Sequence, residues 1–398
     1  MARETQQAEV VVAGHVCLDV IPSFPAAAAG GEFFVPGKLR IVDAPAISTG
    51  GAVSNTGLAL HRLGVPVRLV GKVGDDDFGR IVLRVFERHS PALTAGVVVS
   101  QQDQTSYTII LEPPGCDRMF LHCPGANDTF TAHDVTDAQL RGARLFHFGY
   151  PPIMRRMYQQ AGGELATLFR RVKKAGLTTS LDMAQPDPHS EAGQADWVSI
   201  LEQVLPHVDV FLPSIDEIIY MLDPRESARL QRLPPADQKA AISGQLPTVA
   251  GRLLELGVAV VALKLGEEGL YLRTTADRSR LERMGACGVE PSLWVGREAL
   301  APCFQVHVAG TTGAGDCTIA GFLAGLLQGD TPEGVLKLAV AVGACSVEQP
   351  DATSGVPSLD QVERRIRRGW ERKQVSLPLP GWEWEEGCGL WWGPRDSV

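Results

Sequence analysis

The 398-residue sequence lacks several patterns that would assign it to a specialised class of protein. No apolar run reaches the roughly 18 residues typical of a membrane-spanning helix, and the first residues show no signal-peptide pattern. None of the eight cysteines forms a C-x-x-C pair, so neither a zinc site nor a disulfide scaffold is expected. The net charge of −9 leaves no basic surplus to neutralise nucleic-acid phosphates. We therefore expect a cytoplasmic protein with reduced thiols, and neither nucleic acid nor membrane as a partner.

Three common signatures of nucleotide-binding and hydrolytic sites are also missing. The sequence contains no G-x-x-x-x-G-K-[ST], no G-x-S-x-G, and no G-x-G-x-x-G at 313–318, where threonine takes the third glycine position. These absences count against P-loop kinases, ordinary dinucleotide dehydrogenases and α/β-hydrolases.

Short apolar runs alternate with segments of helical period along most of the chain. Continuous apolar strands separated by helices predict a parallel sheet that is covered on both faces. The expected strands are 10–13, 67–74, 144–150, 177–183, 208–214 and 258–266, and the expected helices are 55–64, 77–90, 156–174, 313–328, 332–347 and 358–368.

Two segments and the C-terminal end depart from this pattern. The segments at about 15–48 and 96–125 have β character without helices, which predicts a small antiparallel sheet that projects from the main domain. In the extension 369–398, the last 27 residues contain four of the seven tryptophans. So many aromatic residues argue against disorder, and we expect the extension to pack on its own domain or to contact a second subunit.

The stretch "TTGAGD" precedes a predicted helix and indicates an anion site. The small residues Gly313, Ala314 and Gly315 would leave the first N–H groups of the helix facing open space, where the helix dipole favours negative charge. Asp316, the next residue, is a potential base.

A second glycine-rich stretch, "STGGAVSN", lies near the N-terminus. Gly50 and Gly51 would allow a ligand to approach the backbone closely, and the amide of Asn55 could donate to and accept from a hydroxyl group. Taken alone, the same pattern is more typical of a tight turn with an asparagine near the start of a helix.

The order of these motifs resembles the ribokinase/pfkB family of carbohydrate and nucleoside kinases. "GGAVSN…LHRLG" and "VGKVGDDDFG" are similar to its N-terminal signature, and "GTTGAGDCTIAGFLAGLLQG" to its C-terminal one. "VDVFLPSIDE" and "VVALKLGEEG" fall where the family has its magnesium-associated and nucleotide-binding segments. The resemblance implies an α/β, ribokinase-like fold: a doubly wound, mostly parallel sheet between helices, with a β lid. The kinase domain would cover 1–368, with lid segments at about 15–48 and 96–125, and the Trp-rich extension 369–398 would follow.

The resemblance also implies an activity and a set of site residues. The activity is transfer of the ATP γ-phosphoryl group, with Mg²⁺, to a hydroxymethyl group of a small sugar or sugar acid. Asp316 would be the base and the backbone of Gly313, Ala314 and Gly315 the anion hole. Glu217 would hold Mg²⁺ through water. The acceptor would contact Asp19, Gly50, Gly51 and Asn55, and the nucleotide would lie beside Ser214, Lys264 and Gly266.

Four positions depart from the family's pattern. Ser214 replaces the asparagine of an N-x-x-E motif, and Val53 replaces a small residue. Gly310 replaces an aspartate that helps several members to bind a monovalent cation. Val340 replaces an asparagine that many members have near the nucleotide.

These departures leave alternatives open. A nucleoside kinase would need an apolar or aromatic wall, which Phe24, Phe33 and Phe34 could supply. Ser214 and Gly310 would suit a sugar- or nucleotide-binding regulator without turnover, whereas the intact "GAGD" opposes it. Arg118, in the second lid segment, could reach the substrate or lie on the surface. A homodimer through the lid or the extension is also expected.

Overall fold

The computed structural model describes residues 8–25, 36–113 and 119–397. Phe33, Phe34 and Arg118 therefore lie outside the described residues. The central sheet has ten strands in the order β15-β16-β14-β13-β12-β11-β10-β9-β1-β4, of which the six from β12 to β4 are parallel and the other four antiparallel. The parallel strands are β1 (Val10–Gly14), β4 (Val67–Val70), β9 (Leu145–Gly149), β10 (Thr178–Asp182), β11 (Val210–Phe211) and β12 (Val260–Lys264).

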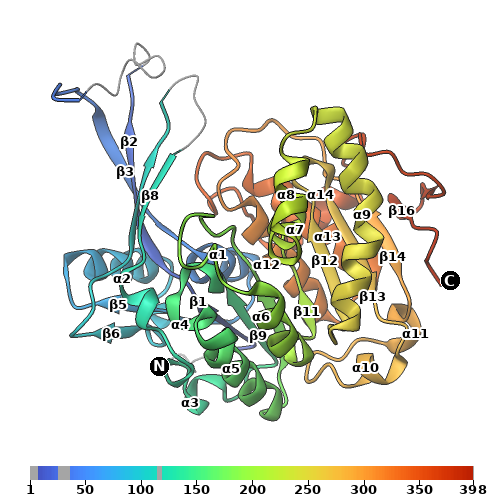
Figure 1. Ribbon diagram of the computed structural model, residues 1–398, viewed down its shortest axis with the longest axis horizontal. Helices are drawn as coiled ribbons and strands as arrows, with labels where there is room; N and C mark the ends of the chain where they lie inside the picture. Colours follow the sequence, from blue (N-terminus) through green and yellow to red (C-terminus); the bar gives the residue numbers. More distant parts are fainter. Residues whose placement is uncertain (1–7, 26–35, 114–118, 398) are drawn as a thin grey trace.

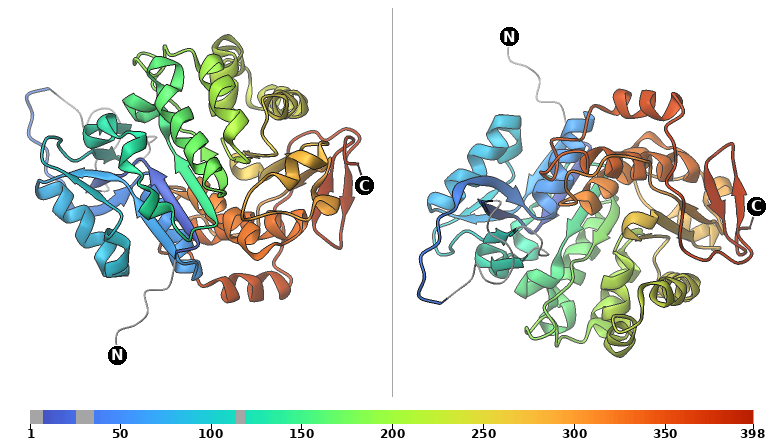
Figure 2. Two further views of the ribbon diagram at one scale, coloured as in Figure 1. Left: turned by 90° about the horizontal axis from the view of Figure 1, so that it is seen from below. Right: turned by 90° about the horizontal axis from the view of Figure 1, so that it is seen from above.

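Helices cover both faces of this sheet (Figure 2). In β1, Val10 and Val12 face one hydrophobic core, and Val11 and Ala13 face the other. Because both faces are packed, the strand sequences are continuously apolar instead of alternating. The first core is covered by α1 (Ala52–Leu63), α12 (Ala314–Gln328), α13 (Pro332–Ser346) and α14 (Leu359–Arg367), and the second by α5 (Gly163–Lys174), α6 (Trp197–Val204), α7 (Ile215–Leu222) and α9 (Pro235–Glu255).

The lid is a separate four-stranded sheet that projects from the body (Figure 1). Its strand order is β3 (Asp43–Gly50), β2 (Cys17–Ser23), β7 (Tyr107–Leu111) and β8 (Met119–Cys123). The outer pairs are antiparallel, but β2 and β7 are parallel. The prediction of an antiparallel lid was therefore wrong at its centre, because both central strands run in the same direction. The segment β6 (Val98–Ser100) pairs with β5 (Lys72–Gly74) in a third, two-stranded sheet.

Two predicted elements are interrupted. The helix expected over 156–174 is divided into α4 (Arg155–Tyr158) and α5, because Gln160 and Ala161 have left-handed φ values of 51° and 52°. The strand expected over 67–74 is divided at Gly71, where a Cβ atom would lie 2.7 Å from Cγ1 of Val16. The remaining helices are α2 (Asp77–His89), α3 (Asp137–Leu140), α8 (Pro224–Leu230), α10 (Arg278–Glu282) and α11 (Pro291–Trp294).

The C-terminal extension adds two strands to the edge of the main sheet. β16 (Leu390–Trp392) pairs with β14 (Glu298–Ala301), which itself pairs with β13 (Leu270–Thr274), and β15 (Glu383–Glu385) completes a hairpin. Leu390 is fully buried, and the guanidinium group of Arg297 lies 4.1 Å from the ring centroid of Trp392. The extension therefore packs on its own domain, as expected from its tryptophans.

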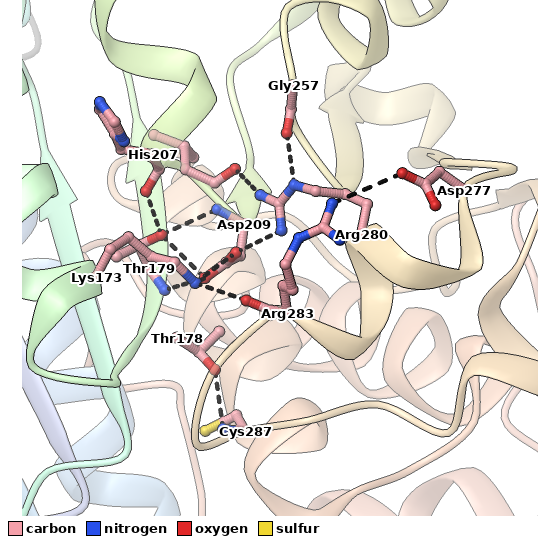
Figure 3. Close-up of polar contacts among 11 residues, drawn as sticks. Lys173, Thr178, Thr179, His207, Asp209, Gly257, Asp277, Arg280, Arg283 and Cys287 are labelled. Atoms are coloured by element: carbon pink, nitrogen blue, oxygen red, sulfur yellow. Dashed lines mark hydrogen bonds and ion pairs between the residues drawn. The ribbon is translucent and has the colours of Figure 1, made fainter.

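A buried ion network joins the amino-terminal ends of β10 and β11 to α5 and α10 (Figure 3). Asp209 is fully buried and accepts hydrogen bonds from Lys173 Nζ, Arg280 Nη1 and the backbone N–H of Thr179, each at 2.8 Å. These charged groups lie at the amino-terminal ends of the strands, away from their carboxyl ends, so the network stabilises the fold. Within the described residues, no helix is both long and apolar enough to cross a membrane.

Candidate active site

Asp316 lies in the first turn of α12, and its position depends on the glycine before the helix. Gly313 has a φ of 70°, and a Cβ atom there would lie 2.6 Å from Cβ of Ala352, so the turn requires glycine. Asp316 is 3% exposed. Its Oδ2 accepts hydrogen bonds from Asn55 Nδ2 at 3.0 Å and Tyr150 Oη at 2.8 Å.

The two carboxylate oxygens of Asp316 are not equivalent. Oδ2 has two good donors, whereas, among the described residues, Oδ1 accepts only from Thr56 Oγ1, at 3.3 Å. Burial raises the pKa of Asp316, and the hydrogen bond from Asn55 and the nearby Lys264 ammonium act against that rise. The carboxylate is thus held in place while one of its oxygens retains room for a further partner.

A buried ion pair lies beside this carboxylate. Lys264, the last residue of β12, places its Nζ 2.6 Å from Oδ1 of Asp182, the last residue of β10. Burial raises the pKa of Asp182, the Lys264 ammonium opposes the rise, and the Glu217 and Asp316 carboxylates add to it. Oδ2 of Asp182 is buried and has no hydrogen-bond partner in the part of the chain that the structure describes, so it is an acceptor available to a cation or a proton.

A cavity of about 530 Å³ opens beside the start of α12. Its walls include every residue that the sequence placed near the nucleotide or its phosphates: Ser214, Glu217, Lys264, Gly266, Gly313, Ala314, Gly315 and Asp316. One side of the cavity is apolar and is formed by Val306, Val308, Val340 and Val347. A helix N-terminus, an ammonium group and an apolar side together suit a nucleotide.

Ser214 directly precedes α7, and Glu217 lies in the first turn of that helix. Glu217 Oε2 accepts a hydrogen bond from the backbone N–H of Ser214 at 2.7 Å, and the Ser214 hydroxyl caps the same helix. The serine therefore has a local structural role that an asparagine could share. Among the described residues, no group of three or more His, Cys, Asp or Glu is arranged to bind a metal alone. Mg²⁺ commonly needs only one or two carboxylates with water and phosphates, which Glu217 and Asp182 can supply.

The second glycine-rich stretch packs against the lid strand β2. Asp19 on β2 is 8% exposed, and a Cβ atom on Gly50 would lie 2.3 Å from its Oδ2. Gly51 has a φ of 87°, and a Cβ atom there would lie 2.4 Å from Nδ1 of His15. Burial raises the pKa of Asp19 to about 6, and hydrogen bonds from Cys17 and Thr108 act against the rise.

Of the residues that the sequence predicts on the acceptor side, Asn55 contacts Asp316 directly, and the others approach it through neighbouring residues. Asn55 bonds to the carboxylate, and the ring of His15 lies 6.1 Å from that of Tyr150, which also bonds to it. From the lid, His122 places Nε2 3.4 Å from Nε2 of His15. Asp19, Gly50, Gly51 and Asn55 thus lie along one continuous set of contacts.

Sequence reasoning missed Tyr150, Asp182, Thr56 and the two histidines. A signal existed for the first two: Tyr150 directly follows β9 and Asp182 ends β10, and ligands of open parallel sheets bind at the carboxyl ends of the strands. Tyr150 has a left-handed φ of 69°, a conformation that non-glycine residues adopt mainly at functional or strained positions. Nothing in the sequence indicates that His15 and His122 lie against each other.

The close approach of Pro350 explains why position 310 is a glycine. A Cβ atom at this position would lie 2.8 Å from the carbonyl oxygen of Pro350 and 2.9 Å from its Cα. An aspartate could therefore not be accommodated without moving the backbone. This packing accounts for the departure from the family's pattern.

A doubly wound sheet, a helix that begins after a glycine turn beside a cavity, a buried carboxylate and a β lid together have the architecture of a small-molecule kinase. Residues 7–359 match the sequence model of the pfkB family of carbohydrate kinases. The chain belongs to this family.

Individual relatives agree with this assignment. The chain is 27% identical over 300 residues to an uncharacterised sugar kinase of Archaeoglobus fulgidus, covering 75% of this chain and 98% of the relative. It is 25% identical over 356 residues to an ATP-dependent ribose-1-phosphate kinase of Halopiger xanaduensis, covering 89% and 96%. Among solved structures, a fructokinase with bound ATP from Xylella fastidiosa has a TM-score of 0.67 at 20% identity, covering 90% of this chain and 98% of that one.

Proposed function

We propose that the protein transfers the γ-phosphoryl group of ATP, with Mg²⁺, to a hydroxymethyl group of a small sugar or sugar acid. The observation that carries this proposal is the position of Asp316. Its buried carboxylate stands at the amino end of α12, on the wall of the 530 Å³ cavity, and is linked through Asn55 and Tyr150 to the lid side. A hydroxyl group held there would meet a base and a phosphate site together.

Asp316 would act as the base through Oδ1. Because Asn55 and Tyr150 both donate to Oδ2, the lone pairs of Oδ1 are the less occupied ones. Phosphoryl transfer proceeds through a loose transition state, so the acceptor needs accurate placement more than strong activation. A carboxylate fixed by three donors meets that requirement.

The start of α12 would receive the migrating phosphoryl group. Gly315 lies beside Lys264: a Cβ atom there would be 3.5 Å from Cδ of the lysine. The N–H of Ala314 donates to the carbonyl of Thr311 at a long 3.3 Å, so a phosphate oxygen could displace this bond. Gly313, Ala314 and Gly315 would then form the anion hole, and Lys264 would exchange part of its contact with Asp182 for the phosphates.

Glu217 would hold Mg²⁺ through water, with the unpartnered oxygen of Asp182 nearby. Ser214 and Gly266 would border the nucleotide as cavity-wall residues. On the acceptor side, the carboxylate of Asp19 would accept hydrogen bonds from sugar hydroxyls. Gly50 and Gly51 would allow a sugar to approach the backbone.

The direct test is ADP formation with ATP and Mg²⁺ across a panel of neutral sugars, sugar acids and nucleosides. We expect a sugar or sugar acid to support turnover and omission of Mg²⁺ to abolish it. Turnover with nucleosides alone would show that the acceptor is a nucleoside and not a sugar. Nucleotide and sugar binding without turnover on the whole panel would indicate a regulator.

We also propose that two chains pair through their lids. The lid carries an unusual set of exposed apolar side chains: Leu39 and Ile41 are 87% and 79% exposed, and Phe120 and Leu121 are 60% and 56% exposed. Apolar side chains this exposed are unfavourable in water, and a partner chain that covers them would remove this cost. Sedimentation velocity should show a dimer, and the substitution Phe120→Asp should shift it toward monomer. A monomeric unaltered protein at micromolar concentration would contradict this proposal.

A further inference from the structure

The start of the C-terminal extension forms part of the cavity structure. Residues 370–373 run beside 302–305 in antiparallel orientation, with the N–H of Gln305 donating to the carbonyl of Glu371 at 2.9 Å. The N–H of Lys373 donates to the carbonyl of Cys303 at 2.7 Å. Cys303, Gln305 and Lys373 all line the cavity, so the extension supports one wall and contributes to it.

Side chains of the extension fix an aromatic residue of that wall. The ring of Trp370 stacks on Phe304 at a centroid distance of 4.4 Å and an angle of 19°. The guanidinium of Arg372 lies 3.8 Å from the centroid of the same ring, and its Nη1 donates to the carbonyl of Pro302 at 2.8 Å. Phe304 lines the cavity and is 4% exposed. Its position is therefore set by contacts with the extension.

The extension also contacts a second wall, the turn that follows β12. Lys373 Nζ forms an ion pair with Oε2 of Glu267, a cavity-lining residue whose side chain is 64% exposed. Ser376 donates its backbone N–H to Oε2 of Glu268 at 2.7 Å, and Lys239 Nζ lies 2.7 Å from Oε1 of the same residue. The turn thus presents two adjacent carboxylates, and each has a lysine partner.

The charge of Glu267 presents a problem for a nucleotide site. Its hydrogen bond and ion pair with Lys373 hold its pKa below the usual range, so the carboxylate is ionised at neutral pH. A nucleotide triphosphate in the same cavity is a polyanion, and like charges within a few ångströms repel where solvent screening is incomplete. Lys373 supplies the nearer compensating charge, and Lys239, with Nζ 3.4 Å from Oε1 of Glu267, supplies a second one. Lys373 belongs to a segment beyond residue 359, where the match to the family ends.

We propose that the C-terminal extension completes the nucleotide site, with Lys373 masking the Glu267 carboxylate from the bound polyphosphate while Trp370 and Arg372 fix the Phe304 wall. This inference rests on the proposed function only in taking a nucleotide as the ligand of the cavity. It gives the extension a role in binding in addition to its role in the sheet.

The test is a double-mutant cycle on binding of a non-hydrolysable ATP analogue with Mg²⁺, measured by titration calorimetry. Lys373→Met should weaken binding about three- to fivefold, the range expected for a partly exposed charge pair. Glu267→Gln should bind at least as tightly as the unaltered protein. The double variant should return to within about twofold of the unaltered protein, because removing the carboxylate removes the need for masking.

Two controls separate this charge effect from unfolding. Lys174→Met removes another lysine, at the end of α5 near the opposite sheet edge, and should leave binding unchanged. Unchanged melting temperatures of all variants would confirm that the fold is intact, and the Lys373→Met defect should shrink at high salt.

Three results would overturn the inference. They are unchanged binding by Lys373→Met, a double variant as weak as that single variant, and a defect that does not respond to salt. Failure of the unaltered protein to bind any nucleotide would instead contradict the proposed function, and with it the premise of this inference.

Discussion

Acceptor binding should depend on pH through Asp19. Burial raises the pKa of this carboxyl group to about 6. Its ionised form accepts hydrogen bonds from two hydroxyl groups, whereas its protonated form has lost part of that capacity. Acceptor binding should therefore strengthen as pH rises through about 6 and weaken below it.

The magnitude follows from the fraction of Asp19 that is ionised. With a pKa of about 6, the ionised fraction rises from roughly a tenth at pH 5 to roughly nine tenths at pH 7. If only the ionised form binds well, the acceptor affinity changes by up to about tenfold over this range. Among the groups around Asp19, burial raises the pKa of the Cys17 thiol well above its usual value and lowers the pKa of both His15 and His122. The comparison with Asp19→Asn isolates the contribution of the Asp19 carboxyl group.

The assay is calorimetric titration of the preferred acceptor between pH 5 and pH 7.5, in an Asp316→Asn background so that the second carboxylate of the site does not titrate. Asp19→Asn in the same background should bind more weakly at pH 7 and show a flat profile. Binding that is independent of pH with Asp19 present would refute this reasoning. So would an unchanged pH dependence after Asp19→Asn.

Three further predictions concern positioning, stability and cations. Tyr150→Phe removes a hydrogen bond that favours the ionised form of Asp316. The acidic limb of the pH profile of kcat should therefore move to higher pH, and kcat should fall about three- to thirtyfold. An unchanged acidic limb would show that Tyr150 does not position the base. Asp209→Asn leaves the Lys173 and Arg280 cations at a buried site with a weaker partner, which should lower the free energy of unfolding by about 3 kcal/mol. In a chain of 398 residues this loss lowers the melting temperature by about 4 °C. A decrease under about 1 °C in calorimetry would contradict the stabilising role of the network. With Gly310 in place of an aspartate, initial rates in Na⁺, K⁺ or a large organic cation should agree within about threefold, and a tenfold stimulation by K⁺ would contradict this expectation.

Much of the fold could be predicted because the strands are buried on both faces. Continuous apolar runs such as "VVVAG" are too short for helices, and they indicate strands when helical segments of full length separate them. The failures have two different causes. Gln160 and Ala161 adopt left-handed conformations that interrupt a helix despite a helical pattern, and the parallel pairing of β2 with β7 depends on long-range register, which local sequence does not encode.

The candidate site was predictable where its geometry is local to one motif. The turn before α12 needs Gly313, and the same six residues supply Asp316, so a single stretch indicates both the anion site and the carboxylate. Contacts between distant segments were not predictable. Tyr150 lies 166 positions from Asp316, and Lys373 lies 106 positions from Glu267; only the folded chain brings each pair together.

The most direct test of the account is the turnover of Asp316→Asn, measured as ADP formation with the preferred acceptor and saturating ATP and Mg²⁺. The substitution preserves the shape of the side chain, so melting temperature and affinity for the ATP analogue should stay close to those of the unaltered protein. Turnover should fall by at least about a hundredfold, the effect expected when a positioned base is lost. Near-normal turnover in a folded, nucleotide-binding Asp316→Asn variant would contradict the assignment of Asp316 as the catalytic base.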